Sequence, residues 1–190
     1  MMGPPGSGKG TQAARIAAAL SVPAISTGDI FRTNIAAETP LGRTAKQYLY
    51  AGEYVPDEVT NEMVRARLLE ADAAHGWLLD GYPRTLAQVH ELDAITASMS
   101  HAVEAVVALH VDEEELVRRL ARRALDEGRV DDTEEVIRHR QALFRQETEP
   151  LLAAYDERRV LQAVDGDGEI DDVTGRILHT LAGIRSAQQL

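Results

Sequence analysis

The chain of 190 residues contains no cysteine, which excludes disulfide bonds and any zinc site built on cysteine ligands. It also lacks any run approaching the roughly 18 apolar residues that a membrane-spanning helix needs. Its first residues, Met-Met-Gly-Pro-Pro, have neither the charged nor the apolar region of a signal peptide. We therefore expect a cytoplasmic protein that holds no zinc and does not contact a membrane.

Lysine is scarce, and the net charge is negative. Lys9 and Lys46 are the only lysines among 20 basic residues, and the formal net charge is −11. Such a chain repels nucleic acid as a whole, so any phosphate must be bound by a local cluster, made mostly of arginine. A GTPase-type switch needs an Asn/Thr-Lys-x-Asp motif to read its base. Neither lysine of this chain lies in such a motif, which argues against that class of protein. An acidic surface on a small domain favours a monomer.

Short apolar runs alternate with helical patterns along the whole chain. The runs occupy residues 22–26, 76–82, 105–111 and 160–164, and helical periodicity fits residues 9–20, 29–37, 41–50, 57–74, 84–98, 113–127, 132–157 and 170–186. This alternation predicts a single α/β domain with a parallel sheet covered by helices on both faces. Ligands bind such sheets at the carboxyl ends of the strands.

The segment from Gly3 to Thr11, Gly-Pro-Pro-Gly-Ser-Gly-Lys-Gly-Thr, has the composition of a phosphate-binding loop. Glycines let backbone N–H groups turn toward an anion, and a helix beginning near Lys9 points its positive end at the same anion. Lys9 adds a full charge for the outer phosphates. Because Gly10 follows the lysine, Thr11 is not expected to bind Mg²⁺ directly. The alternative is a glycine-rich turn without a ligand.

Only two residues precede this loop, although a strand of about five residues usually does. We therefore expect the chain to begin inside, or just after, a central strand. A mis-set start, a truncation or a natural short form would each explain this. Because part of the central strand is then missing, a poorly folded and inactive protein is one alternative.

A carboxylate ends the apolar run at residues 76–82. Asp80 is expected at the carboxyl end of a buried strand, where an isolated charge is unfavourable without a cation or hydrogen-bond donors nearby. A water-mediated contact to Mg²⁺ would satisfy it, because Mg²⁺ keeps several of its waters. A helix N-cap or a salt bridge are the alternatives. Trp77 is a packing residue in this interpretation, and the six histidines match no pattern of ligands or catalytic groups.

Taken in order, these motifs resemble those of adenylate kinases, in the nucleoside-monophosphate kinase family. The glycine loop is similar to that family's loop, and Ile-Ser-Thr-Gly-Asp-Ile-Phe-Arg at 25–32 resembles its monophosphate-binding segment. Asp-Gly-Tyr-Pro-Arg-Thr at 80–85 resembles its second fingerprint. Arg-x-x-x-Arg at 119–123, Arg-Val-Asp-Asp at 129–132 and Arg-His-Arg at 138–140 resemble its lid elements. The resemblance covers nearly the whole chain.

The resemblance implies a P-loop NTPase three-layer fold with a central parallel sheet flanked by helices. It also implies an AMP-binding helical insert at 26–55 and a short lid at 123–130, of the subclass without a zinc knuckle. The implied reaction is the reversible, Mg²⁺-dependent conversion of ATP and AMP into two ADP, which serves adenine nucleotide homeostasis and nucleotide biosynthesis. A UMP/CMP kinase of the same superfamily is the alternative.

The resemblance also assigns roles to individual residues. The implied ATP-binding residues are Gly6, Ser7, Gly8, Lys9, Gly10, Thr11, Arg119 and Arg123, with Arg119 stacked on the adenine. The implied AMP-binding residues are Thr27, Arg32, Arg84, Gln88, Arg129 and Arg140, with Thr27 and Gln88 near the adenine. The implied catalytic residues are Lys9, Arg84, Arg123, Arg129 and Arg140, and Asp80 would order hydrated magnesium with help from Asp131 and Asp132. Read alone, Arg32 is equally a solvated helix arginine, and Arg118 and Arg122 are assigned to a solvated face.

Overall fold

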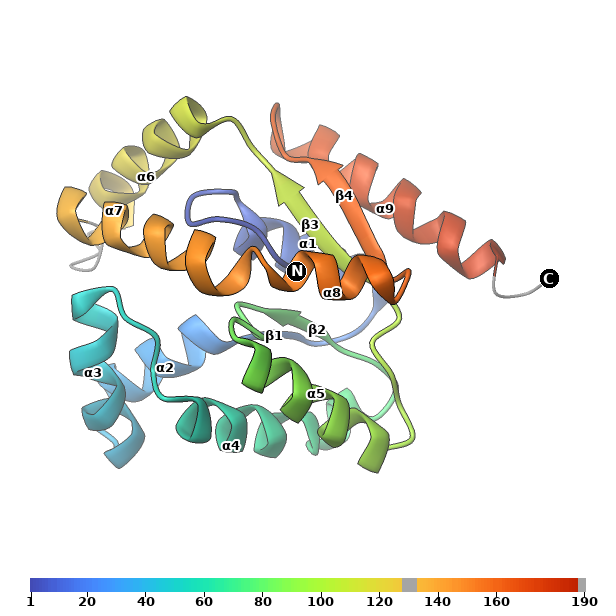
Figure 1. The fold of residues 1–190 in the computed structure, drawn as a ribbon, viewed down its shortest axis with the longest axis horizontal. Helices are drawn as coiled ribbons and strands as arrows, with labels where there is room; N and C mark the ends of the chain where they lie inside the picture. The colour runs from blue at the N-terminus through green and yellow to red at the C-terminus, as the bar shows by residue number, and fades with distance from the viewer. Residues whose placement is uncertain (128–132, 188–190) are drawn as a thin grey trace.

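The computed structural model describes residues 1–127 and 133–187, with side chains for 1–123 and 133–184. Helices alternate with short strands, as the sequence predicts for the α/β class (Figure 1). The elements in chain order are α1 (Lys9–Leu20), β1 (Ala24–Ser26), α2 (Thr27–Ala36), α3 (Pro40–Ala51), α4 (Asp57–Leu68), the 3₁₀ turn η1 (Ala71–Ala73), β2 (Leu78–Asp80), α5 (Leu86–Ser98), β3 (Val106–His110), α6 (Glu113–Glu127), α7 (Glu134–Leu143), the π-helical η2 (Phe144–Thr148), α8 (Leu151–Glu157), β4 (Leu161–Asp165) and α9 (Ile170–Ala187). No helix of the described residues is long and apolar enough to cross a bilayer.

The parallel sheet consists of two strand pairs, β1–β2 and β3–β4, with the amino terminus between them (Figure 1). The Met2 amide N–H donates to the Val107 oxygen at 2.8 Å, and the Leu109 N–H donates to the Met2 oxygen at 3.0 Å. The Met1 ammonium donates to the Leu79 oxygen at 2.8 Å. Met1 and Met2 therefore occupy a central strand position and connect the pairs, in agreement with the parallel sheet that the sequence predicts.

Apolar side chains cover both faces of this sheet. Val107 and Leu109 of β3 pack with Ile16 of α1 and Ile177 of α9. Val106, their neighbour on the same strand, packs instead in a cluster with residues of α5 and α8. Successive side chains of a strand point to opposite faces, so β3 contributes to two cores. This buried sheet holds the ends of its strands, and the loops that follow them, in fixed positions.

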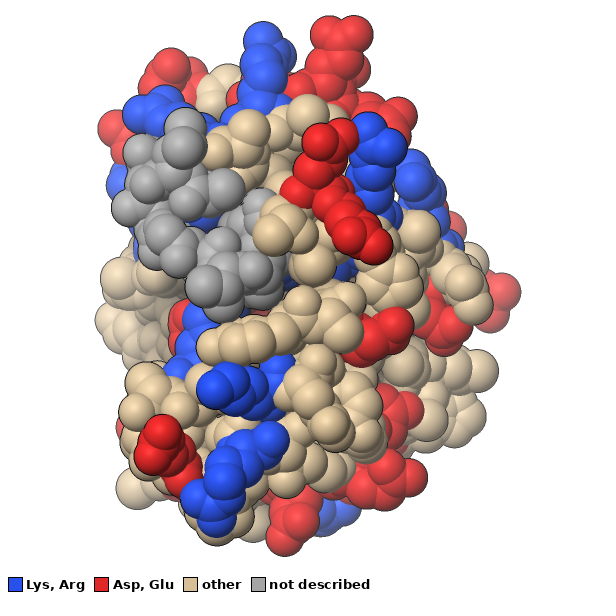
Figure 2. Space-filling view, turned by 90° about the vertical axis from the view of Figure 1, so that its left-hand side faces the viewer, with Lys and Arg blue, Asp and Glu red and all other residues tan. Residues whose placement is uncertain are grey.

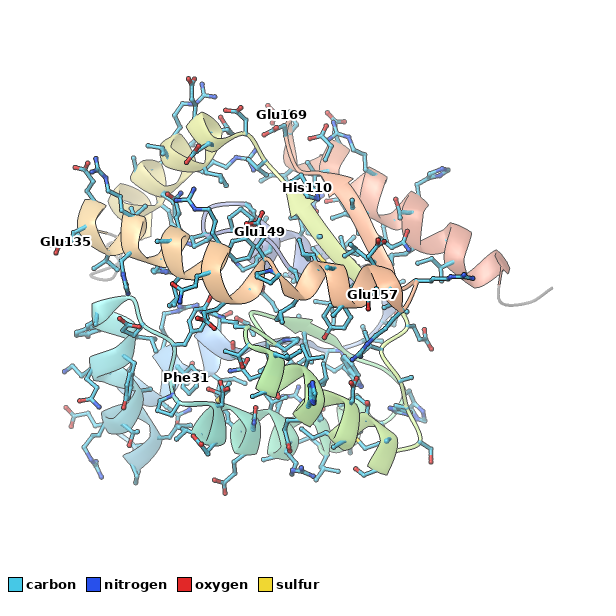
Figure 3. All side chains as sticks on the ribbon, in the orientation of Figure 1. Phe31, His110, Glu135, Glu149, Glu157 and Glu169 are labelled. Atoms are coloured by element: carbon cyan, nitrogen blue, oxygen red, sulfur yellow. The ribbon has the colours of Figure 1, made fainter. Side chains whose placement is uncertain are left out.

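The helices α2, α3 and α4 pack together beside β1 and β2. Phe31, labelled in Figure 3, is buried with Ala45 and Val55. The helices α2 and α3 approach so closely that a Cβ on Gly42 would lie 2.0 Å from the backbone oxygen of Asn34. This contact leaves room only for glycine.

Two predicted helices are interrupted. The helix predicted over 57–74 ends at Leu68, and only a 3₁₀ turn follows it. The helix predicted over 132–157 divides into α7, the π-helical segment and α8. In the π-helical segment the Glu149 N–H donates to the Phe144 oxygen at 2.9 Å. Pro150 then interrupts the α-helical pattern, because it has no N–H and its ring collides with the preceding turn.

Capping side chains and one proline account for shifted boundaries elsewhere. The Ser26 hydroxyl accepts from the Asp29 N–H at 3.3 Å, so α2 begins at Thr27 and not at 29. The Thr85 hydroxyl accepts from the Gln88 N–H at 3.2 Å, so α5 begins at Leu86 and not at 84. The first predicted strand starts later than expected, because Pro23 cannot donate to a ladder.

Candidate active site

The glycine loop wraps around the amino end of α1. Gly3, Gly6 and Gly8 all have positive φ, at 152°, 87° and 82°. A Cβ on Gly6 would lie 2.8 Å from Cγ of Leu120, so the loop also packs closely against α6. The Ser7 hydroxyl is buried and has no hydrogen-bond partner among the described residues. This loop and the helix amino end together form the kind of backbone cradle that binds phosphate.

Lys9 is partly buried within a cluster of charged groups. Burial lowers the pKa of its ammonium from 10.5 to about 8. The negative charge of Asp80 opposes this change, whereas the positive charges of Arg84, Arg140 and Arg123 add to it. The structure therefore brings together four of the five residues predicted to be catalytic, with the carboxylate of Asp80. The fifth, Arg129, lies outside the described residues.

Asp80 ends β2 close to the start of α1. Its side chain is 8% exposed, and its Oδ1 has no hydrogen-bond partner in the part of the chain that the structure describes. A Cβ on Gly10 would lie 3.4 Å from the other carboxylate oxygen. The N-cap of α5 is Thr85, so the N-cap alternative for Asp80 is wrong. An unpaired buried oxygen beside a phosphate cradle fits hydrated magnesium, which takes oxygen ligands and keeps its waters.

Among the described residues no group of three or more acidic, histidine or cysteine side chains could hold a metal ion. Mg²⁺ is typically bound by one or two carboxylates and by substrate phosphates, so such a group is not required. Asp131 and Asp132, the predicted helpers of Asp80, lie outside the described residues.

A cavity of about 60 Å³ lies between α2, the loop after α3 and the loop after β2. Five predicted monophosphate-binding residues line it, namely Thr27, Arg32, Arg84, Gln88 and Arg140. The Thr27 hydroxyl donates to the Gly81 oxygen at 3.0 Å, and the Arg32 guanidinium donates to Asp29 at 2.5 Å. Residues from four separate parts of the chain therefore meet at one cavity.

Gln88 is 2% exposed, and two hydrogen bonds hold its amide in one orientation. Its Oε1 accepts from the Arg84 N–H at 2.7 Å, and its Nε2 donates to Asp57 Oδ1 at 2.6 Å. The other Asp57 oxygen accepts from the Thr85 hydroxyl at 2.8 Å. Sequence reasoning missed Asp57, since an acid in the first turn of a helix is common for reasons of the helix dipole alone.

Several contacts hold Arg84 in place. Its Nε donates to the Gly81 oxygen at 2.7 Å, and its guanidinium carbon lies 5.0 Å from the centre of the Tyr54 ring. The Thr148 hydroxyl donates to the Arg84 oxygen at 2.9 Å and lies 2.8 Å from the Tyr54 hydroxyl. A second cavity, of about 40 Å³, has Lys9, Arg84, Tyr54 and Thr148 in its wall. No local pattern singles out Tyr54 or Thr148, because their partners are remote in sequence.

The arginines of α6 divide between two environments. Arg119 donates to the Gly166 oxygen at 3.1 Å and to the Ser7 oxygen at 3.5 Å, and it pairs with Glu115. It therefore lies against the glycine loop. Arg118 is 73% exposed, in agreement with the solvated face predicted for it, and Arg122 is exposed as well. Figure 2, which views the molecule from the left-hand side of Figure 1, shows basic side chains in the middle and lower part of this face and others at its top, with acidic side chains between them.

Comparison with known proteins identifies the family. The adenylate kinase family profile matches residues 1–160. A protein named adenylate kinase from Nocardioides sp. is 59% identical over 95% of both chains. Proteins of the same name from Micrococcus luteus and Renibacterium salmoninarum are 57% and 55% identical, over 98% and 99% of this chain and 91% and 97% of their own lengths. These matches favour neither the UMP/CMP kinase nor the inactive alternative. The chain belongs to the adenylate kinase family.

Proposed function

We propose that this chain transfers a phosphoryl group reversibly between ATP and AMP, giving two ADP, at the site between the glycine loop and the 60 Å³ cavity. The reaction is that of its family. The observation that supports this site is the convergence of Lys9 with Arg84, Arg123 and Arg140. Phosphoryl transfer requires alignment and charge stabilisation more than covalent chemistry, and four cations around one point suit both needs.

On the ATP side, the backbone N–H groups of the loop at Gly6 to Thr11 would bind the phosphates, and Lys9 would bind the outer ones. Arg119 would contact the adenine. Support for this placement comes from its hydrogen bonds to Ser7 and Gly166, which hold it beside the loop. Arg123 and Arg140 would stabilise charge on the group in transfer, together with Arg129.

On the AMP side, Arg32 and Arg84 would bind the phosphate, and Thr27 and Gln88 would lie at the adenine. A carboxamide has two N–H groups and two acceptor lone pairs. Asp57 uses one N–H and the Arg84 amide uses one lone pair of Gln88, which leaves one donor and one acceptor for a ligand. That pair is complementary to the edge of adenine, which offers an acceptor beside an amino donor. The clamp on Gln88 would hold this pair in position before AMP arrives.

Magnesium is part of the proposal. Asp80 would hold the hydrated ion through water, as its unpaired buried oxygen supports. When bound, Mg²⁺ neutralises charge on the phosphates and orients them.

The proposal extends to the motions that exclude water. Residues 26–55 would form the AMP-binding part and residues 123–130 the lid of one domain that spans 1–190. Closure of both would keep water from the phosphoryl group and so prevent hydrolysis of ATP, and the adenylate kinase lid is a known example of such closure. We further propose that the protein acts as a monomer in the cytoplasm, where its nucleotides are found. The net charge of −11 supports the monomer.

The deciding experiment measures ADP formation from ATP and Mg²⁺ with AMP, UMP, CMP or GMP as acceptor. Rapid turnover with AMP and slow turnover with the others is the expected result. Comparable turnover with UMP or CMP would contradict the adenine specificity assigned to Thr27 and Gln88. A matched pair of chains with Arg84→Ala or Arg118→Ala separates the site from the solvated face of α6. Sedimentation of the same preparation tests the monomer.

A further inference from the structure

A cavity of about 220 Å³ lies outside the set of residues assigned to nucleotides. It is formed by the carboxyl end of β3, the first turns of α6 and the segment that runs from α7 to α8. Gly3 and Pro4, at the start of the glycine loop, form part of its wall. In the part of the chain that the structure describes, no residue of this wall is among those assigned to ATP, AMP or Mg²⁺. The cavity is therefore available to a ligand of another kind.

Apolar side chains form much of this wall. They include Leu109 of β3, Leu116 of α6, Phe144 of η2 and Leu152 of α8. An engineered apolar cavity of about 150 Å³ in another protein binds benzene. A cavity of about 220 Å³ therefore has room for one aromatic ring with a short chain attached to it. Phe144 favours an aromatic ring in particular, because two rings attract each other through their edges and faces.

The charged side chains of the wall do not balance. Arg145 donates to Glu113 at 3.3 Å, so these two charges pair with each other. Glu149 is exposed, and its carboxylate has no hydrogen bond or ion pair. Figure 3 labels Glu149, between η2 and α8, and His110, the last residue of β3, which also lines the cavity. With histidine neutral, the wall carries one negative charge that no protein cation compensates, which favours a cationic ligand and disfavours a nucleotide.

A buried amide of the wall also lacks a partner. The Nε2 atom of Gln141 is buried, and it has no hydrogen-bond partner among the described residues. A buried N–H group without an acceptor is unfavourable. A ligand that brings an acceptor to Gln141 removes this penalty, and so gains more than an exposed hydrogen bond would give.

We propose that this cavity binds a small aromatic amine that has a hydrogen-bond acceptor on its ring. The ammonium pairs with Glu149, the ring packs against Phe144 and Leu116, and the acceptor takes the N–H of Gln141. A hydrogen bond between two charged groups is stronger than one between neutral groups, so the ammonium anchors the ligand. The apolar contacts and the Gln141 bond then distinguish aromatic amines with an acceptor from other cations.

The test titrates tyramine into the full chain and measures the heat of binding. Tyramine has an ammonium, one ring and a phenol oxygen that can accept from Gln141. A weakly alkaline buffer keeps histidine neutral while the ammonium stays charged. Two matched compounds serve as controls. Phenethylamine lacks the hydroxyl and should bind about tenfold more weakly, whereas para-hydroxyphenylpropionate carries a carboxylate in place of the ammonium and should not bind.

Matched variants assign the two polar contacts. Glu149→Gln should weaken both amines about tenfold, and Gln141→Leu should weaken tyramine about tenfold without weakening phenethylamine. Glu157→Gln is the control for charge, because Glu157 is an exposed acid of α8 that does not line the cavity. It should leave both affinities unchanged. The midpoint of thermal unfolding of each variant without amine shows that the variant is folded.

Three results would overturn the proposal. The first is the absence of saturable binding at millimolar tyramine. The second is equal weakening by Glu149→Gln and Glu157→Gln, which would mean that the amine is attracted only to the acidic surface. The third is displacement of tyramine by ADP, which would place the amine in the nucleotide site. ADP formation by the same preparation is measured separately, so failure of the amine site is distinguishable from failure of the proposed reaction.

Discussion

Replacing Lys9 by methionine is expected to stabilise the nucleotide-free protein while it abolishes most of its activity. Lys9 is partly buried, and this burial lowers the pKa of its ammonium from 10.5 to about 8 despite the nearby charge of Asp80. The charge of this cation therefore lowers the free energy of unfolding, because only the folded state keeps it away from water. Methionine keeps most of the apolar stem and removes the charge, so this loss of stability disappears with it.

The size of the effect follows from the two pKa values. A fall in the pKa from 10.5 to about 8 means that the charged lysine lowers the free energy of unfolding by about 3 kcal/mol. For a chain of this length, the midpoint of thermal unfolding of Lys9→Met should therefore be roughly 6 to 12 °C higher than that of the wild type. Turnover should fall on the order of 10²-fold or more, because the lysine would stabilise charge on the phosphates.

The pH dependence has a definite sign. Below pH 8 both the folded and the unfolded wild type hold the proton, and the full loss of stability from the buried charge applies. Between pH 8 and 10.5 the folded state releases the proton first, so the wild type gains stability relative to Lys9→Met as the pH rises. The difference between the two chains should therefore be largest near pH 7 and vanish near pH 10.5.

Thermal unfolding of nucleotide-free protein at several pH values measures this difference, and ADP formation measures the activity. Lys46→Met is the matched control, because Lys46 is exposed and is the other lysine of the chain. Its midpoint and turnover should change little. A lower midpoint for Lys9→Met at pH 7, or a difference that does not narrow with rising pH, would refute the reasoning.

Four further substitutions test other parts of the site and its surroundings. Arg84→Ala should lower turnover on the order of 10²-fold, whereas Arg118→Ala on the solvated face should be nearly silent in the same ADP assay, and a hundredfold loss there would mean that α6 presents a different face. Asp57→Asn should raise the KM for AMP about tenfold with a smaller change in kcat, since it weakens a charge-assisted hydrogen bond to Gln88; an unchanged KM would remove the positioning role. Gly6→Ala should lower the midpoint of thermal unfolding by several degrees, because of its φ of 87° and the leucine side chain 2.8 Å from the added Cβ, and a neutral result would show that the loop can relax.

Local chemistry made several features predictable. The glycines around Lys9, the periodic apolar positions of the helices and the strand that ends in Asp80 each depend on neighbours in sequence. The structure agrees with these predictions, with boundaries shifted by Ser26, Thr85 and Pro23. Such shifts arise from one capping hydroxyl or one missing N–H, which is why the position of an element is easier to predict than its last residue.

Contacts between remote segments were beyond prediction from the residues alone. Thr148 touches both Arg84 and Tyr54 because a π-helical segment brings it there, and its own neighbours carry no sign of that. The partnership of Asp57 with Gln88 is of the same kind.

The sequence by itself determined the chemical groups of the site: a phosphate-binding loop with its lysine, a set of arginines and an acid at the end of a strand. The tertiary structure decided which of these groups meet, because loop closure over many residues, and not local propensity, sets those distances.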